Sequence, residues 1–318
     1  MQRNTSIDIA RFIFAFLVVV IHVPIFGGKF IMPFARCSVP FFYIVAGFYL
    51  YTEDQNRFSY KLIKNIRKWF YLWSIYTLIF TTIAVALNYL SGNDFSFHNN
   101  DVINMLTSGT CKALDIVSIK GHEFGISVVL WFLHAGFLSF IFLYFIRKKL
   151  DSFMTIFLMS ILLLVSCFIN CYYESIIVYR AIAVAIPFIY TGCIVRKYIN
   201  RIIAIKTSLI LKCILFFTIT LYIEALFYNS EVYYSTIILT LLIFVYLLKY
   251  PNLFGIQLRI PLKVSMDIYL WHRLIYALLF GCFSLNFLKG IAAIIVFCIT
   301  LLLFTFIRNR QKVLSNHE

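Results

Sequence analysis

The chain has 318 residues, of which 62% are hydrophobic and only 13% are charged, and its mean hydropathy is +0.91. A soluble domain of this length cannot bury so much apolar surface, which excludes soluble enzymes and soluble nucleic-acid-binding proteins despite a net charge of +15. We therefore expect an all-α, polytopic membrane protein that forms one integral-membrane domain over residues 1–318, without a nucleic-acid partner. The eight cysteines show no metal-ligand spacing, so no metal site is expected.

Apolar runs near the roughly twenty residues that a helix needs to cross a bilayer predict about ten transmembrane helices. The first could pass for a signal peptide, but it lacks a small-x-small cleavage pattern and is kept as the first membrane helix. In chain order the ten runs are 7–26, 37–51, 69–90, 126–146, 152–170, 175–195, 207–228, 232–249, 264–284 and 287–307.

The basic residues between these runs predict the orientation. With the N-terminus in the cytoplasm, the inside loops and tails hold 19 Lys and Arg residues and the outside loops hold 5. This asymmetry is typical of the positive-inside rule and places both termini in the cytoplasm. The one long outside connection, 91–125, is polar and is a candidate lid or acceptor-contact loop.

Arg11 and His22 are the most informative ionisable pair, because they are eleven residues apart in the first apolar run. On an α-helix that spacing places them within roughly 20° of one face and about 16 Å apart. Ionisable groups at this depth are costly and indicate a functional, protein-enclosed path. Asp8 has the spacing for an ion pair with Arg11, which is the structural alternative for both. His22 has the chemistry of a general base or an acyl acceptor, and the alternative is a hydrogen bond to a neighbouring helix.

Further polar residues lie in other apolar runs. Ser265, Tyr269 and His272 share a polar stripe in the ninth run, which serves either the site or interhelical hydrogen bonding. His134, Arg180 and Glu224 are expected to face the bundle interior. The basic run Lys61, Lys64, Arg67 and Lys68 suits a phosphate-rich donor or anionic lipid headgroups.

An ordered set of short motifs covers nearly the whole chain. It comprises Asp8-Ile-Ala-Arg11, His22, Arg36-Cys-Ser38-Val-Pro40-Phe-Phe, Gly47-Phe48, Trp131-Phe-Leu, Arg180 with Phe188 and Gly192, and Ser265 with Tyr269-Leu-Trp-His272. The set resembles the membrane-bound acyltransferase-3 family. Two departures are Ala46, where the family has a serine, and Trp69, where the family usually has a proline soon after a basic pair.

The resemblance implies an O-acyltransferase of the cell inner (plasma) membrane. Such an enzyme passes an acyl group, usually acetyl, from cytoplasmic acyl-CoA to a hydroxyl of an extracytoplasmic glycan, such as O-antigen, capsule or a lipid-linked glycan. The expected partners are the acyl-CoA donor substrate, the glycan and membrane lipids, with no permanently bound cofactor.

The resemblance also assigns roles to residues. Arg11 and His22 match the family's essential arginine and histidine, with Asp8 beside them. Lys64 and Arg67 match a basic pair near the donor, and Arg36 is grouped with them. The supporting or substrate-contacting residues are Trp131, His134, Arg180, Ser265, Tyr269 and His272.

Two other classes of membrane protein share the composition. A polysaccharide flippase or polymerase would not need the Arg11–His22 spacing. A small-solute transporter would use intramembrane Glu224 and Arg180, but no inverted repeat is visible in the sequence.

Overall fold

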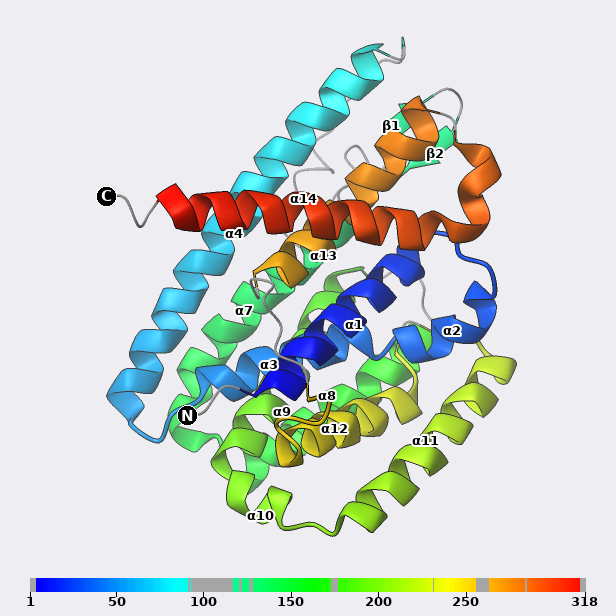
Figure 1. The fold of residues 1–318 in the computed structure, drawn as a ribbon. Helices are drawn as coiled ribbons and strands as arrows, with labels where there is room; N and C mark the ends of the chain where they lie inside the picture. The colour runs from blue at the N-terminus through cyan, green and yellow to red at the C-terminus, as the bar shows by residue number, and fades with distance from the viewer. Residues whose placement is uncertain are drawn as a thin grey trace.

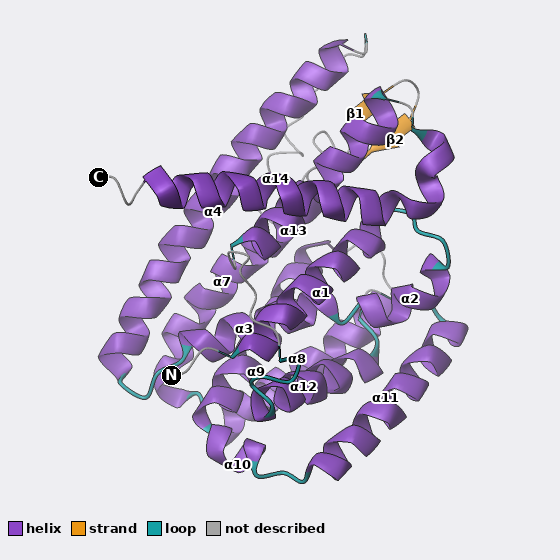
Figure 2. Cartoon of the chain, in the orientation of Figure 1, coloured by secondary structure: helices purple, strands orange, loops and turns teal. Residues whose placement is uncertain are grey.

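The structure is a computed structural model, and it describes residues 4–90, 92, 117–119, 122–125, 128–172, 177–230, 232–255, 263–283 and 285–314. Within these ranges the fold is all-α apart from one short hairpin (Figures 1 and 2). The helices are α1 (Thr5–His22), α2 (Gly28–Ala35), α3 (Ser38–Leu50), α4 (Gln55–Leu90), α7 (Trp131–Ile146), α8 (Phe153–Tyr172), α9 (Ile177–Lys197), α10 (Ile199–Ile203), α11 (Thr207–Phe227), α12 (Tyr234–Lys249), α13 (Val264–Tyr276) and α14 (Ala292–Leu314).

Short elements join or extend these helices. The 3-10 turns η1 (Val128–Leu130), η2 (Arg147–Lys149) and η4 (Asn286–Ile291) lie beside α7 and α14, and the π-helical turn η3 (Ala277–Cys282) extends α13. In the hairpin, β1 (Val117–Ile119) pairs antiparallel with β2 (His122–Phe124), so that Ser118 lies opposite Glu123. The hairpin belongs to the predicted outside connection, most of which lies outside the described residues.

The all-α prediction is confirmed, and a helix occupies each of the ten predicted apolar runs. Among the described residues, five helical segments are long and apolar enough to cross a membrane. These are Thr5–His22, Gly28–Leu50, Gln55–Leu90, Thr207–Phe227 and Phe287–Gln311. The count of ten crossings and the side on which the termini lie stay predictions.

Two helical stretches include residues that lie outside the predicted apolar runs. α2 is helical over residues expected to form a loop, and Tyr222 of α11 fixes it by donating a hydrogen bond to the Phe30 carbonyl (2.8 Å). α4 begins at Gln55 instead of residue 69, because the Asp54 carboxylate accepts hydrogen bonds from the backbone N–H groups of Asn56 (2.8 Å) and Arg57 (3.2 Å). Such an N-cap starts a polar helix that a count of apolar residues does not detect.

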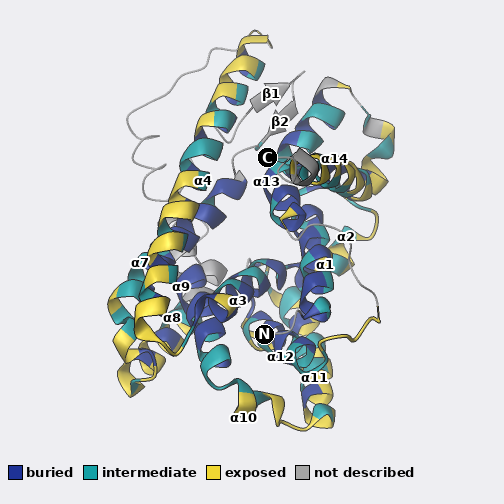
Figure 3. Cartoon of the chain, turned by 60° about the vertical axis from the view of Figure 1, so that its left-hand side comes forward, coloured by how far each residue is buried: buried dark blue, intermediate teal, exposed yellow. Residues whose placement is uncertain are grey.

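α1 lies at the centre of the bundle. Buried positions make up 61% of α1 but only 11% of the most apolar window of α11, whose outward leucines and phenylalanines are exposed (Figure 3). α1 packs against α13, α3, α14 and α12. A polar side chain on the inner face of α1 is therefore enclosed by protein.

α3 and α9 cross at two glycines. A Cβ atom at Gly47 would lie 1.9 Å from the Ile189 carbonyl oxygen, and one at Gly192 would lie 2.1 Å from the Ile44 carbonyl oxygen. Small residues permit such close approach in membrane helices. The crossing fixes these two helices against each other.

Backbone contacts define two ends of the molecule. At the end where α1 begins, called the terminal end here, the Asn4 side chain donates a hydrogen bond to the Leu247 carbonyl (3.1 Å). At the opposite end, Ala293 N–H donates to the Pro24 carbonyl (3.1 Å). Asp267 and Arg308 form a two-bonded ion pair (2.7 and 2.9 Å) that ties α13 to α14.

Candidate active site

Two histidines of the predicted site lie together at the opposite end. The rings of His22 in α1 and His272 in α13 are stacked, with centroids 5.4 Å apart and an interplanar angle of 28°. His272 is fully buried, whereas His22 is only partly buried. As a residue, His22 is therefore less buried than His272.

The backbone of α13 fixes the tautomer of His272. Its Nδ1 lies 2.7 Å from the Tyr269 carbonyl oxygen and 3.2 Å from that of Ile268. Because a carbonyl oxygen only accepts, Nδ1 carries the proton, and Nε2 of the neutral ring is a bare acceptor. Nε2 is buried, and no described residue forms a hydrogen bond with it. A buried polar atom of this kind points to a bound ligand or water.

Two cations lie near His22. Arg273, the residue after His272, donates from Nη1 to the His22 carbonyl (2.9 Å) and from Nε to the Gly125 carbonyl (2.6 Å). The guanidinium group of Arg36, just after α2, also lies within electrostatic range of the His22 ring. The environment of His22 is positive, which suits the stabilisation of an oxyanion.

Aromatic rings close the site on the side of α3 and α7. The Tyr269 ring lies 4.7 Å from the Phe132 ring, which stacks on Tyr43 at 4.5 Å. The Tyr43 hydroxyl donates to the Phe132 carbonyl (3.1 Å). These buried contacts leave the imidazole pair in a largely apolar enclosure, where electrostatic interactions are strong.

A stripe of small buried side chains on α1 connects Arg11 with His22. α1 is helical throughout, so the near-whole number of turns between the two residues is preserved. Ala15 and Val18 lie between them on the same face, and at most 1% of the surface of each residue is exposed. The Arg11 Nε atom is also buried, and no described residue forms a hydrogen bond with it.

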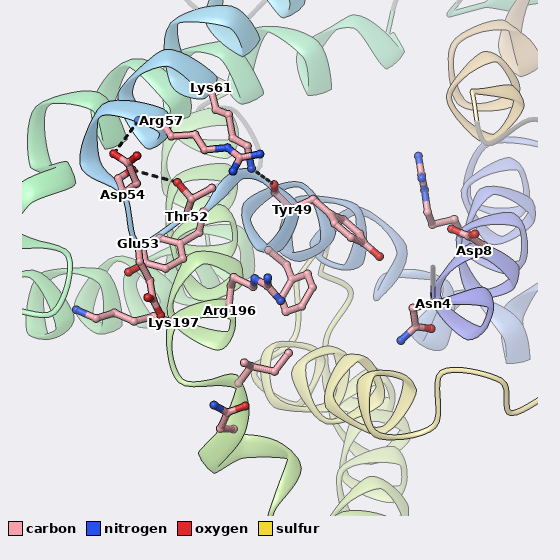
Figure 4. A pocket seen from close by; sticks show the side chains of 15 residues that line it. Asn4, Asp8, Tyr49, Thr52, Glu53, Asp54, Arg57, Lys61, Arg196 and Lys197 are labelled. Atoms are coloured by element: carbon pink, nitrogen blue, oxygen red, sulfur yellow. Dashed lines mark hydrogen bonds between the residues drawn. The ribbon is translucent and has the colours of Figure 1, made fainter. Parts of the chain in front are cut away.

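A large cavity opens around Arg11 at the terminal end. It encloses about 1230 Å³ (Figure 4). Asn4 and Asp8 lie on one side, and Tyr49, Arg57 and Lys61 lie on the other. The full lining is Asn4, Asp8, Arg11, Phe48, Tyr49, Tyr51, Thr52, Glu53, Asp54, Arg57, Lys61, Arg196, Lys197, Ile199 and Asn200.

The cavity lining carries five cations and three carboxylates, so its charge is positive. The Arg196 guanidinium lies 5.2 Å from the Phe48 ring centre, and Lys61 donates to the Tyr49 carbonyl (3.2 Å). Lys197 pairs with Asp151 (2.6 Å), and its hydrogen bond lowers the pKa of that carboxyl group. Burial raises the pKa of the Tyr51 hydroxyl, which is neutral near pH 7 with or without this shift.

The residues predicted to bind the donor are separated in the structure. Lys64 and Arg67 are exposed on α4 and do not line the cavity, whereas Lys61, three residues before Lys64, does. Arg36 lies near His22, at the other end of α1. Asp8 lies in the cavity beside Arg11, and its charge acts on that guanidinium.

The predicted supporting residues fall into two groups. Tyr269 and His272 belong to the imidazole cluster, and Ser265 is fully buried two turns earlier on α13. His134 packs on the Trp73 ring (5.2 Å) at the contact of α4 and α7, and Trp131 begins α7. Arg180 is in α9, but its side chain lies outside the described residues.

Sequence reasoning missed Arg273, Arg57 and Arg196 as site residues. Arg57 and Arg196 are loop-proximal cations that were counted only as topology signals. Arg273 is adjacent to the motif ending in His272, and this adjacency was the one available signal. The meeting of Arg57 with Arg196 at the cavity, and of Arg273 with His22 at the opposite end, depends on tertiary contacts that no spacing in the sequence encodes.

Glu224 has a structural role at the start of α12. Its carboxylate accepts hydrogen bonds from the Ser235 hydroxyl (2.7 Å), the Ser235 backbone N–H (3.2 Å) and the Tyr228 hydroxyl (3.2 Å). A carboxylate near a helix N-terminus satisfies unpaired N–H groups. These contacts give the half-buried Glu224 a structural role.

Comparison with known proteins gives one result. A family model described as an acyltransferase domain matches residues 4–308, which include both ends of the α1 stripe. Neither a curated protein nor a solved structure matches the chain.

Proposed function

Since the chain belongs to the acyltransferase-3 family, we propose that it transfers an acyl group, most simply acetyl, from cytoplasmic acyl-CoA to a hydroxyl of an extracytoplasmic glycan. In this proposal the protein resides in the cell inner (plasma) membrane. The terminal end faces the cytoplasm, and the imidazole cluster lies near the outer surface.

One observation carries the proposal: α1 has a large basic cavity at one end and the stacked imidazole pair of His22 and His272 at the other. Arg11 lies in the cavity, and His22 lies about 16 Å along the same helix face. A transferase that takes its donor on one side and its acceptor on the other needs this arrangement. A polymerase or flippase does not need a reactive imidazole at the end of such a stripe.

The cavity supports the donor side of the proposal. A CoA donor carries several phosphate charges and a long, flexible thioester arm. The cations of the lining suit the phosphates, and Arg11, whose Nε lacks a described partner, suits a carbonyl or phosphate oxygen of the arm. Since Ala15 and Val18 are packed in the core between Arg11 and His22, passage of the arm toward His22 requires the neighbouring helices to separate along this face of α1.

His22 and its neighbours support the chemical step. The thioester carbon–sulfur bond breaks and an ester carbon–oxygen bond forms, while the hydroxyl proton passes to His22 and then to the departing thiolate. In the alternative route, His22 first carries the acyl group as an acyl-imidazole and the hydroxyl attacks this intermediate. In both routes the positive groups near His22 stabilise the oxyanion.

The function is tested by comparing surface glycans from cells with and without the gene by mass spectrometry. We expect the glycan masses to differ by the mass that one acyl ester adds, which is about 42 mass units for an acetyl ester. A change in glycan chain length, or complete loss of the glycan, contradicts the proposal and favours a polymerase or flippase.

The donor site is tested with two pairs of cations. Replacing the cavity residues Arg57 and Lys61 by glutamine is expected to raise the KM for acyl-CoA at least about tenfold, because each charge-assisted hydrogen bond contributes about 1.5–3 kcal/mol. The kcat should change little, since these contacts bind donor and transition state equally. The measurement is steady-state kinetics with labelled acyl-CoA.

The same measurement with Lys64 and Arg67 replaced by glutamine decides where the donor binds. The cavity placement predicts a smaller rise in KM for this exposed pair than for Arg57 and Lys61. A larger rise places the donor on the exposed face of α4. Replacing Lys148 and Lys149 of η2, which are exposed and outside the cavity lining, controls for loss of net charge.

A further inference from the structure

Arg273 joins three parts of the chain that meet beside His22. Its guanidinium donates from Nη1 to the His22 carbonyl (2.9 Å) and from Nε to the Gly125 carbonyl (2.6 Å). His22 is the last residue of α1, Gly125 follows β2 in the outside connection, and Arg273 itself belongs to α13. One side chain therefore links the site helix, the outside connection and the helix that carries His272.

The bond to His22 has a clear physical basis. The last carbonyl groups of a helix have no intrahelical partner, and the helix dipole makes this end negative. A cation that donates to the final carbonyl satisfies an acceptor and complements that dipole. Because Val23 is already extended, the helix cannot supply another donor from its next turn.

Arginine suits this position for a geometric reason. Its planar guanidinium holds several donors in fixed directions, so two carbonyl groups from distant segments are bound at once. A lysine ammonium at the end of a flexible stem does not impose the same geometry. His272, the preceding residue, stacks on the His22 ring at 5.4 Å, so adjacent residues of α13 hold both the backbone and the ring of His22.

We propose that Arg273 is a positioning residue for acyl transfer: it fixes the end of α1, and with it His22, relative to the outside segment that ends at Gly125. The inference rests on the proposed function, in which His22 acts on the acceptor hydroxyl. Arg273 acts through His22 and leaves donor binding, which occurs at the other end of α1, unaffected. A misplacement of about 1 Å in a reacting group lowers a rate by up to about 10²-fold.

The test replaces Arg273 by alanine, glutamine and lysine in the full-length protein. We expect kcat for transfer to fall by about 10- to 100-fold in all three variants. The KM for acyl-CoA should stay within about twofold of the wild-type value, because uniform donor binding is unchanged. Guanidinium ion added at millimolar concentration should restore part of the kcat of Arg273→Ala. Lys289→Ala, which removes an exposed cation near the start of α14, should show neither the loss nor the rescue.

Three results overturn the inference. An Arg273→Ala variant with the wild-type kcat shows that the link is not needed. A loss of kcat that guanidinium does not rescue, and that is accompanied by a large fall in the thermal midpoint of the variant, assigns Arg273 to stability alone. A rise in donor KM without a change in kcat places its effect on donor binding. A His22→Ala variant that keeps full transfer refutes the proposed function itself, which distinguishes the two failures.

Discussion

Replacing His22 by alanine is expected to lower acyl transfer by at least about 10²- to 10⁴-fold, the usual contribution of a general base. The loss should be larger if the acyl group passes through His22 itself, because no other group then accepts it. His22 is the last residue of α1, so its removal leaves the buried residues along the rest of that helix in place. The variant should therefore insert and fold, with a thermal midpoint near that of the wild type.

The measurement uses purified protein in lipid nanodiscs with labelled acyl-CoA and the acceptor glycan. Ile21→Ala is the matched control, because Ile21 is the partly exposed neighbour of His22 and forms no part of the proposed chemistry. Incubation without acceptor separates the two routes, since only the nucleophilic route leaves an acyl mass on the peptide that contains His22. A folded His22→Ala variant with normal turnover removes the residue from the mechanism.

Replacing Gly192 by alanine is expected to destabilise the protein by about 3 kcal/mol, the upper end of the usual range for overpacking. The added Cβ would lie 2.1 Å from the Ile44 carbonyl oxygen and 2.8 Å from the Phe48 backbone nitrogen. Both obstacles are backbone atoms, so no side-chain rotation relieves the overlap. α3 and α9 must separate, which also breaks their contacts along the rest of the crossing.

The thermal midpoint in detergent and the yield of folded protein report this effect. Gly290→Ala is the matched control, because nothing lies within 4 Å of the added Cβ and the residue is exposed. We expect a normal midpoint for the control and a large fall, or no folded protein, for Gly192→Ala. A normal midpoint for both variants contradicts the close crossing of α3 and α9.

Local patterns predicted the helices well, and tertiary contacts explain what they missed. A helix occupies every segment predicted from a run of apolar residues, because a membrane helix needs a long apolar stretch that is visible in the sequence. The early start of α4 depends on the Asp54 cap, which adds polar residues to a helix. The helical stretch of α2 depends on contacts such as that between Tyr222 and the Phe30 carbonyl, which join residues far apart in the chain.

The site was predicted in part for the same reason. Arg11 and His22 are eleven residues apart, which is close to three helical turns, so their common face was predictable from helix geometry alone. The stacking of His22 on His272 joins the first and ninth apolar runs, and periodicity says nothing about such a contact. The resemblance suggested Lys64 and Arg67 for the donor, and this stays a prediction. Arg57 and Lys61 line the cavity instead of Lys64 and Arg67, because the orientation of α4 against α3 decides which cations face inward.

The glycine crossing of α3 and α9 limits how the proposed donor cavity can change shape. Phe48 and Tyr49 follow Gly47 directly, and Arg196 lies one turn after Gly192, so both helices supply wall residues within a turn of their point of closest approach. We therefore expect these two walls to move together. A widening that admits a bulkier thioester, or releases the CoA product, would then come from α1, α4, α10 or the segment 51–54.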